Sequence, residues 1–158
     1  MRENNFIGVG GLVVRDGAYL LVRHAYGEYK DWWILPGGYV KDGEALHEAV
    51  EREIREETGV AAETQGVVAV RSRCRGPRTT DCYIVFLMKY GEGEPEADGV
   101  EVTDARFFTA DELEGADNVI VLSKIIIREH QRETLRFLSR NTMHDPYHAD
   151  CDEVQLFL

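Results

Sequence analysis

Apolar and polar positions follow a strand pattern in the first part of the chain. Residues 6–14 are apolar, with β-branched side chains and glycines, and residues 18–23 are apolar again. Between them, Arg15-Asp16-Gly17 is a turn sequence in which Asp-Gly is a strong hairpin signal. The pattern therefore predicts a β-hairpin over residues 6–23.

From residue 43 onward the apolar period becomes helical. At 100° per residue, five apolar side chains fall on one side of a helix: Ala45, Leu46, Ala49, Val50 and Ile54. Asp42 is the predicted N-cap, and Gly59 is a natural helix stop. We therefore expect one helix over residues 43–58.

The remaining pattern predicts further strands over residues 60–74, 82–89 and 101–108. The acidic, glycine-containing residues 91–100 predict a mobile loop. Thr109 is expected to cap a short helix, and a second long helix is expected over residues 119–138.

Three acidic residues in the last turns of the first helix are spaced i, i+3 and i+4. We expect the carboxylates of Glu53, Glu56 and Glu57 to point toward the protein side. Arg52 can neutralise one of them through an i, i+4 pair with Glu56. The remaining charges need a cation, and oxygen ligands suit a hard divalent ion such as Mg²⁺. The alternative is a solvated acidic helix end, although these acids are at the end that the helix dipole disfavours.

These acids belong to a longer motif over residues 38–60. It consists of Gly38, five residues, Glu44, seven residues, and then Arg-Glu-Ile-Arg-Glu-Glu-Thr-Gly-Val from Arg52. The motif resembles the signature of the Nudix hydrolases at every fixed position, and Trp-Ile-Leu-Pro-Gly-Gly over residues 33–38 resembles the family's lead-in. The resemblance implies an α+β Nudix fold, an α/β/α sandwich with a mixed β-sheet between helices.

The resemblance also implies a chemistry, the metal-dependent hydrolysis of a diphosphate linkage in a nucleoside diphosphate derivative. By motif position, Glu53, Glu56 and Glu57 are metal ligands, the backbone carbonyl of Gly38 joins them, and Arg52 orients the carboxylates. Mg²⁺ is the expected cofactor, with Mn²⁺ as a substitute. Glu53 or Glu56 is a candidate general base.

A further acid is expected outside the helix. Glu101 begins a segment that resembles the family strand carrying an acid, an arginine and an aromatic residue. It is a candidate additional metal ligand or base, as are the loop acids Glu94 and Glu96. The alternative for each is an ordinary solvated loop acid.

Candidate substrate-binding residues lie on both sides of the helix in sequence. Four arginines, Arg71, Arg73, Arg75 and Arg78, fall within eight residues and can hold a phosphate or a carboxylate. Alternatively, they keep a strand edge soluble. The aromatic residues Tyr26 and Trp32 are candidates for stacking on a base.

These residues favour ADP-ribose or a related nucleotide sugar as the substrate. Pro77 lies 18 residues beyond Gly59, and families specialised for ADP-ribose often carry a proline about 15 residues beyond the motif. A MutT-like (d)NTP pyrophosphohydrolase is the first alternative. A non-catalytic nucleotide-binding module and a prenyl diphosphate isomerase are the others.

Composition restricts the partners. The net charge is −11, with 29 acidic residues against 18 Lys and Arg, so a nucleic-acid partner is not expected. Three cysteines without metal-binding spacing indicate reduced thiols, and no apolar run suits a membrane span, so we expect a cytoplasmic protein. A small nucleotide is the expected partner, and a homodimer is an open alternative.

The length of 158 residues suits one domain, which we place at residues 1–140. Residues 141–158 are expected to form a tail that packs on this domain or on a partner subunit. The tail contains His144, His148 and Cys151, whose spacing could bind zinc, but nothing else in the chain provides a fourth ligand. An ordinary tail is therefore the favoured interpretation.

Overall fold

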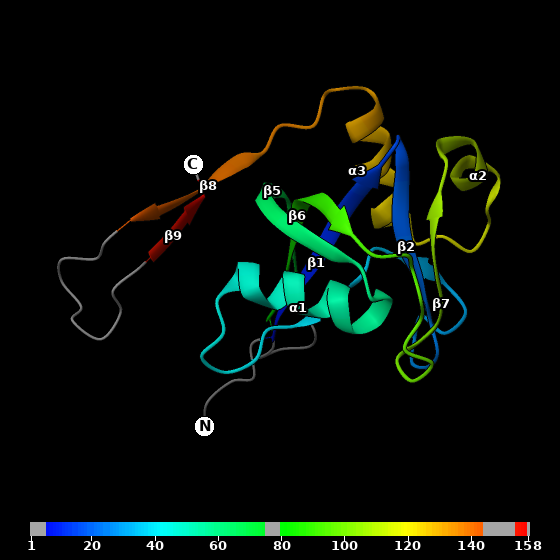
Figure 1. Cartoon of the computed structure of the whole chain (residues 1–158), viewed down its shortest axis with the longest axis horizontal. Helices are drawn as coiled ribbons and strands as arrows, with labels where there is room; N and C mark the ends of the chain where they lie inside the picture. The colour runs from blue at the N-terminus through cyan, green and yellow to red at the C-terminus, as the bar shows by residue number, and fades with distance from the viewer. Residues whose placement is uncertain (1–5, 75–79, 144–153, 158) are drawn as a thin grey trace.

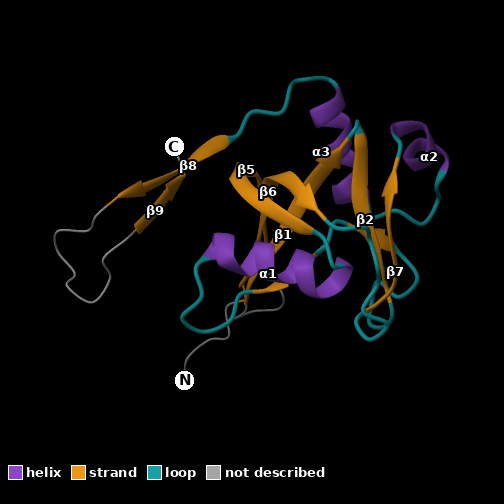
Figure 2. Cartoon of the chain, in the orientation of Figure 1, coloured by secondary structure: helices purple, strands orange, loops and turns teal. Residues whose placement is uncertain are grey.

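The fold combines one mixed β-sheet with helices on both of its faces (Figures 1 and 2). The structure, a computed structural model, describes residues 6–74, 80–143 and 154–157. The strands are β1 (Phe6–Arg15), β2 (Ala18–His24), β3 (Trp33–Ile34), β4 (Gly37–Tyr39), β5 (Ala61–Cys74), β6 (Thr80–Glu92), β7 (Val102–Phe108), β8 (Leu138–Met143) and β9 (Val154–Phe157). The helices are α1 (Leu46–Thr58), α2 (Ala110–Gly115) and α3 (Val121–Gln131).

The main path of the sheet has the strand order β3-β2-β1-β6-β5-β8-β9. β4 pairs with β1, and β7 pairs with β2, both outside this path. The β1–β6 pairing is parallel, whereas β1–β2, β1–β4 and β5–β6 are antiparallel, so the sheet is mixed. The predicted α+β class and the sandwich of helices around a mixed sheet are confirmed.

The central strands are buried on both faces, because each face has its own apolar core. On one face, Ala49, Val50 and Ile54 of α1 pack with Val9 and Phe86. On the other face, the core contains Leu12, Leu21, Trp33, Phe108, Ile126 and Ile127. Complete burial of a side chain of this size contributes about 1.5–3 kcal/mol, so both helix layers are firmly attached to the sheet.

The first helix ends where the sequence predicts and begins later. Gly59 adopts a left-handed conformation with φ 69° and caps the last turn, as expected. The prediction of Asp42 as the N-cap is wrong, because Gly43 has φ 78° and the chain turns there before the helix begins. Ala45 is the N-cap, and its amide donates to the side chain of Glu48.

The second long helix is much shorter than expected. α3 ends at Gln131, and Glu133 adopts a left-handed conformation with φ 55°. Leu138, the predicted last residue of this helix, belongs to strand β8 instead and is 51% exposed. Ile125, within α3, is also exposed.

Strand β5 departs from strict alternation. Its pairing with β6 shifts register between Val67 and Ala69, and Val68 and Ala69 both pack against the core on the α3 side. Strict alternation over residues 60–74 would place these two neighbours on opposite faces, and the register shift prevents it. Beyond the shift, Arg71 and Arg73 follow Ala69 on the same face, which matters for the site described below.

None of the helices in the described ranges is long and apolar enough to cross a membrane. At the C-terminal end, β8 and β9 form a hairpin that extends away from the main body (Figure 1). The ring of Phe157 lies 5.3 Å from that of Phe86, so the end of β9 contacts the core under α1. The tail residues His144, His148 and Cys151 lie outside the described residues.

Candidate active site

The carboxylates of α1 do not all share one environment. Glu53 and Glu57 are buried, with 9% and 3% of their surface exposed. The side chain of Glu56 is 54% exposed and contacts Lys41 and Arg52. The prediction that all three acids point toward the protein is therefore wrong for Glu56, because at 100° per residue it lies about 100° away from Glu57 around the helix.

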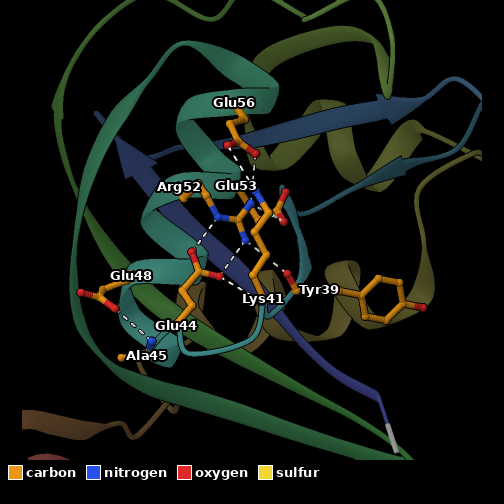
Figure 3. A network of polar contacts seen from close by, with 8 residues as sticks. All are labelled: Tyr39, Lys41, Glu44, Ala45, Glu48, Arg52, Glu53 and Glu56. Atoms are coloured by element: carbon orange, nitrogen blue, oxygen red, sulfur yellow. Dashed lines mark hydrogen bonds and ion pairs between the residues drawn. The ribbon is translucent and has the colours of Figure 1, made fainter. Parts of the chain in front are cut away.

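Arg52 connects most of the acids in this region (Figure 3). Its guanidinium donates to both carboxylate oxygens of Glu44, at 2.6 and 2.9 Å, and to Glu53 at 2.8 Å. It also donates to Glu56 at 3.0 Å, which is the predicted i, i+4 pair, and to the backbone carbonyl of Tyr39 at 3.2 Å. Five such bonds fix the guanidinium, so Arg52 holds the Glu53 and Glu56 carboxylates in place.

The strand β4 lies against the two buried carboxylates. The backbone amide of Gly37 donates to Oε2 of Glu57 at 2.9 Å. A Cβ atom at Gly38 would lie 2.6 Å from the carboxyl carbon of Glu53, so only glycine leaves room for that carboxylate. The Gly37–Gly38 strand and the end of α1 therefore form one closely packed unit.

The electrostatics of this unit favour a bound cation. Burial raises the pKa of Glu57 to about 8, and the nearby charges of Glu53 and Glu101 act in the same direction. Burial also raises the pKa of Glu53, although its bond to Arg52 opposes this. By contrast, the two bonds from Arg52 lower the pKa of Glu44 to about 2. The two buried acids therefore resist ionisation until a positive charge approaches them.

A hard divalent cation fits this set of residues. Glu53 and Glu57 provide oxygen donors, and the side-chain-free Gly38 provides the space beside them. Among the described residues, no group of three His, Cys, Asp or Glu side chains is already gathered as a metal site.

A cavity of about 470 Å³ opens on the other side of the Gly37–Gly38 strand. Both glycines line it, so the same short strand contacts the carboxylates and the cavity. Aromatic and apolar side chains make up much of its wall: Tyr26, Tyr29, Ile34, Leu35, Tyr83 and Leu122. Its volume and its apolar wall are those of a site for a small molecule.

Arg71 and Arg73 line the polar end of this cavity. Each donates to a different carboxylate oxygen of Asp81 at 2.8 Å. The Arg71 guanidinium also lies 5.1 Å from the centre of the Tyr83 ring. Of the two interpretations of the arginine cluster, its place in the cavity favours ligand binding, and in the described structure the carboxylate that it holds is Asp81.

Glu101 lies close enough to influence both parts of the site. Its charge is the largest cause of the raised pKa of Tyr26, and it also raises the pKa values of Glu53 and Glu57. The acidic loop before it is tied down, because the Asp98 carboxylate accepts backbone N–H bonds from residues 100, 101 and 102. The backbone of Glu101 is fixed next to the residue before Tyr26, because its carbonyl accepts from the Ala25 amide at 2.9 Å.

The other candidates from the sequence have different outcomes. Tyr26 lines the cavity. Trp32 is 39% exposed and is absent from the cavity lining, while its neighbour Trp33 is buried in the core. Arg75 lies outside the described residues.

Among the cavity residues that the sequence did not indicate are His24, Asp81 and Tyr83. None belongs to a motif, and a local pattern gives no sign of them. The pairing of β5 with β6, which sets Asp81 beside Arg73 and Tyr83 beside Arg71, is what brings two of them to the site.

Comparisons with known proteins identify the family of this chain. The family model of the NUDIX domain matches residues 5–130. An ADP-ribose pyrophosphatase of Methanocaldococcus jannaschii is 36% identical over 108 residues, which cover 68% of this chain and 63% of that protein. A nucleoside triphosphatase NudI of Escherichia coli is 50% identical over 50 residues, which cover 30% of this chain and 36% of that protein.

Among solved structures, a MutT NUDIX hydrolase from Burkholderia pseudomallei is 28% identical with a TM-score of 0.69. The match covers 80% of this chain and 98% of that one. The chain spans less than two thirds of the length of either curated relative. With the motif, the fold and a family model that matches most of its length, this chain belongs to the NUDIX domain family.

Proposed function

We propose that this protein hydrolyses the diphosphate linkage of a nucleoside diphosphate derivative, with ADP-ribose or a nucleotide sugar as substrate and Mg²⁺ as cofactor. One observation carries the proposal. The Gly37–Gly38 strand has buried carboxylates on one side and a cavity of nucleotide-binding character on the other. A substrate held in the cavity would therefore extend its diphosphate toward Glu53 and Glu57.

The chain's own residues would supply positioning and proton transfer. Glu53, Glu56 and Glu57 would hold the cation, with the Gly38 carbonyl as a further ligand, and Arg52 would keep Glu53 and Glu56 in their orientation. When bound, a divalent cation would offset the negative charge of the diphosphate and of the three carboxylates. Tyr26, Arg71 and Arg73 would hold the part of the substrate that enters the cavity.

In the reaction, a water oxygen forms a bond to one phosphorus atom, and the P–O bond of the anhydride bridge breaks. The bridging oxygen leaves with the second phosphoryl group, so that ADP-ribose gives AMP and ribose 5-phosphate. The proton of the water passes to a carboxylate. Glu101 is a candidate for this base, because its charge acts on Glu53 and Glu57 and it is exposed to solvent, and Glu53 and Glu56 are the alternatives.

One assay tests the proposal. The full-length chain is incubated with ADP-ribose, a nucleotide sugar, NADH and dATP, each with Mg²⁺, with Mn²⁺ or with EDTA, and the products are identified. We expect AMP and ribose 5-phosphate from ADP-ribose, and no turnover with EDTA. Equal turnover with EDTA, or no cleavage of any of the four compounds, would reject the function.

A (d)NTP pyrophosphohydrolase is the second candidate, favoured by the local identity to the triphosphatase NudI. In the same assay it would release pyrophosphate from dATP faster than AMP from ADP-ribose. A nucleotide-binding module without catalysis would bind these compounds and cleave none. The complete set of motif acids, with Glu53 and Glu57 buried, favours catalysis over such a module.

A further inference from the structure

Asp81 occupies an unusual position at the polar end of the cavity. It is the second residue of β6 and pairs with Arg73 of β5 and Phe6 of β1. It is 4% exposed, although most buried acids in proteins need a specific partner to be tolerated. Neither the family motif nor the catalytic residues proposed above account for it.

Within the described part of the chain, Asp81 contacts the two arginines of the cavity wall. One carboxylate oxygen accepts from Arg71 Nη2 and the other from Arg73 Nε, each at 2.8 Å. Burial raises the pKa of Asp81, but the two guanidinium groups outweigh burial, and the net pKa lies below the ordinary value. Asp81 is therefore an anion that both arginines share.

Because both arginines share the Asp81 carboxylate, two positive charges can lie side by side on one strand. Arg71 and Arg73 are two residues apart on one face of a strand, so their positive charges are neighbours. With Asp81 between them the cluster keeps one net positive charge, in a chain whose net charge is −11. Like charges on adjacent positions repel, and the shared carboxylate removes most of that repulsion.

The arginines retain hydrogen-bonding capacity beyond Asp81. Each uses one nitrogen for the bonds described, and a guanidinium has five N–H donors. Arg73 Nη1 reaches the Tyr29 hydroxyl only at 3.5 Å, and both side chains stay partly exposed, 30% for Arg71 and 34% for Arg73. Donors that are fixed in direction and still unused are what a phosphate or hydroxyl oxygen of a ligand requires.

We propose that Asp81 is a positioning residue that fixes Arg71 and Arg73, and that the two arginines then select substrates with anionic or hydrogen-bond-accepting oxygens in the half that enters the cavity. Asp81 acts through the arginines and does not touch the reacting phosphorus. The inference rests on the proposed function, because it concerns the binding half of the same site.

The experiment measures binding without turnover. Calorimetric titrations use ADP-ribose, AMP and dATP with EDTA on the full-length chain, because the proposed reaction needs a cation. Asp81→Asn, Arg73→Ala and the double change are then introduced into that chain. Glu114→Gln is the matched control. Glu114 also pairs with an arginine, Arg128, at 3.0 Å, but neither residue lines the cavity.

We expect Asp81→Asn to raise the Kd of the tightest-binding probe about tenfold, as the loss of an orienting charge pair does. The double change should cost no more than the larger single change, because Asp81 acts through the arginines. Glu114→Gln should leave the Kd unchanged. A Kd within twofold for Asp81→Asn, effects that multiply in the double change, or no binding of any probe would overturn the inference.

Two conservative variants separate a positioning role of Asp81 from a loss of folding. Arg73→Lys keeps the charge of a partly exposed side chain but loses the fork, so we expect a clear loss of affinity. Asp81→Glu keeps the carboxylate and should recover most of the affinity lost in Asp81→Asn. If Arg73→Lys binds like the parent chain, net charge alone is sufficient and Asp81 has no positioning role.

The outcome is separable from that of the proposed function. A parent chain that cleaves nothing but binds a probe in an Asp81-dependent manner would reject hydrolysis and keep the inference. If the Asp81→Asn chain cleaves ADP-ribose as well as the parent chain, the proposed hydrolysis stands and the role of Asp81 is rejected.

Discussion

The two sides of strand β4 differ in how they are built. On the helix side, Glu53 and Glu57 come from one turn of α1, and Arg52 in the same helix fixes part of the cluster. On the cavity side, Arg73 and Asp81 come from two strands and meet only through their register. The comparison separates a chemical centre that is encoded locally from a recognition surface that depends on the whole sheet. Changes on the helix side should therefore affect kcat, and changes on the cavity side KM.

The largest effect is expected on the helix side. Glu57→Gln keeps the shape and the bond from the Gly37 amide but removes the charge, so kcat should fall by about 10²- to 10⁴-fold. The fold should remain intact, because a neutral amide is easier to bury than a carboxylate. Steady-state kinetics and circular dichroism check both statements. Turnover equal to that of the parent chain at saturating Mg²⁺ would remove Glu57 from the mechanism.

A pair of glycine substitutions sharpens the comparison within β4 itself. Gly38→Ala places a Cβ 2.6 Å from the Glu53 carboxyl carbon, so we expect about a 100-fold loss of kcat with a nearly unchanged Tm. Gly37→Ala places a Cβ 2.7 Å from the Gly10 backbone at φ 155°, so the main loss should be in stability. Thermal unfolding and kinetics on both variants decide this. A Gly38→Ala enzyme with full activity would mean that Glu53 has room to move.

The buried acids also predict how stability depends on pH without metal. The pKa of Glu57 is raised from 4.5 to about 8, so its contribution to stability is complete below pH 4.5 and is lost as the pH rises toward 8. In EDTA, Tm should therefore fall over this range, by on the order of 10 °C, and Glu57→Gln should flatten the curve. A Tm that rises between pH 5 and 8 in the parent chain alone would contradict the burial of a protonated Glu57.

The smallest effect concerns the aromatic residues. Tyr26 lines the cavity and Trp32 does not, so Tyr26→Ala should raise KM a few-fold, whereas Trp32→Ala should leave it unchanged. Initial-rate measurements on both variants test the assignment of the cavity as the substrate site. A larger increase in KM for Trp32→Ala than for Tyr26→Ala would mean that the substrate binds outside this cavity.

The helix side could be predicted from the sequence because its determinants are local. The spacing of the acids, the Arg52–Glu56 pair and the Gly59 stop all lie within a few turns. Glu56 was the exception, since periodicity places three residues in one sector without telling which of them the sheet covers. The fold class was also predictable, because the order of strands and helices survives small errors in their boundaries.

The cavity side could be predicted only in part. The register shift at Val67 and Ala69 is invisible to a period-two pattern, and the pairing that brings Asp81 to Arg73 is a contact between strands. The end of α3 at Gln131 likewise depends on a left-handed residue, Glu133, rather than on apolar spacing, which continues past it. The pairing of distant strands thus sets the position of Asp81, and a single backbone conformation ends α3. The apolar pattern of the sequence contains neither.

The central claim is that the two buried acids of α1 serve a divalent cation. A titration of Mn²⁺ followed by electron paramagnetic resonance, on the parent chain and on a Glu53→Gln/Glu57→Gln double variant, tests it without any substrate. We predict saturable binding to the parent chain and its loss in the double variant. Equal Mn²⁺ binding by both chains would contradict the account.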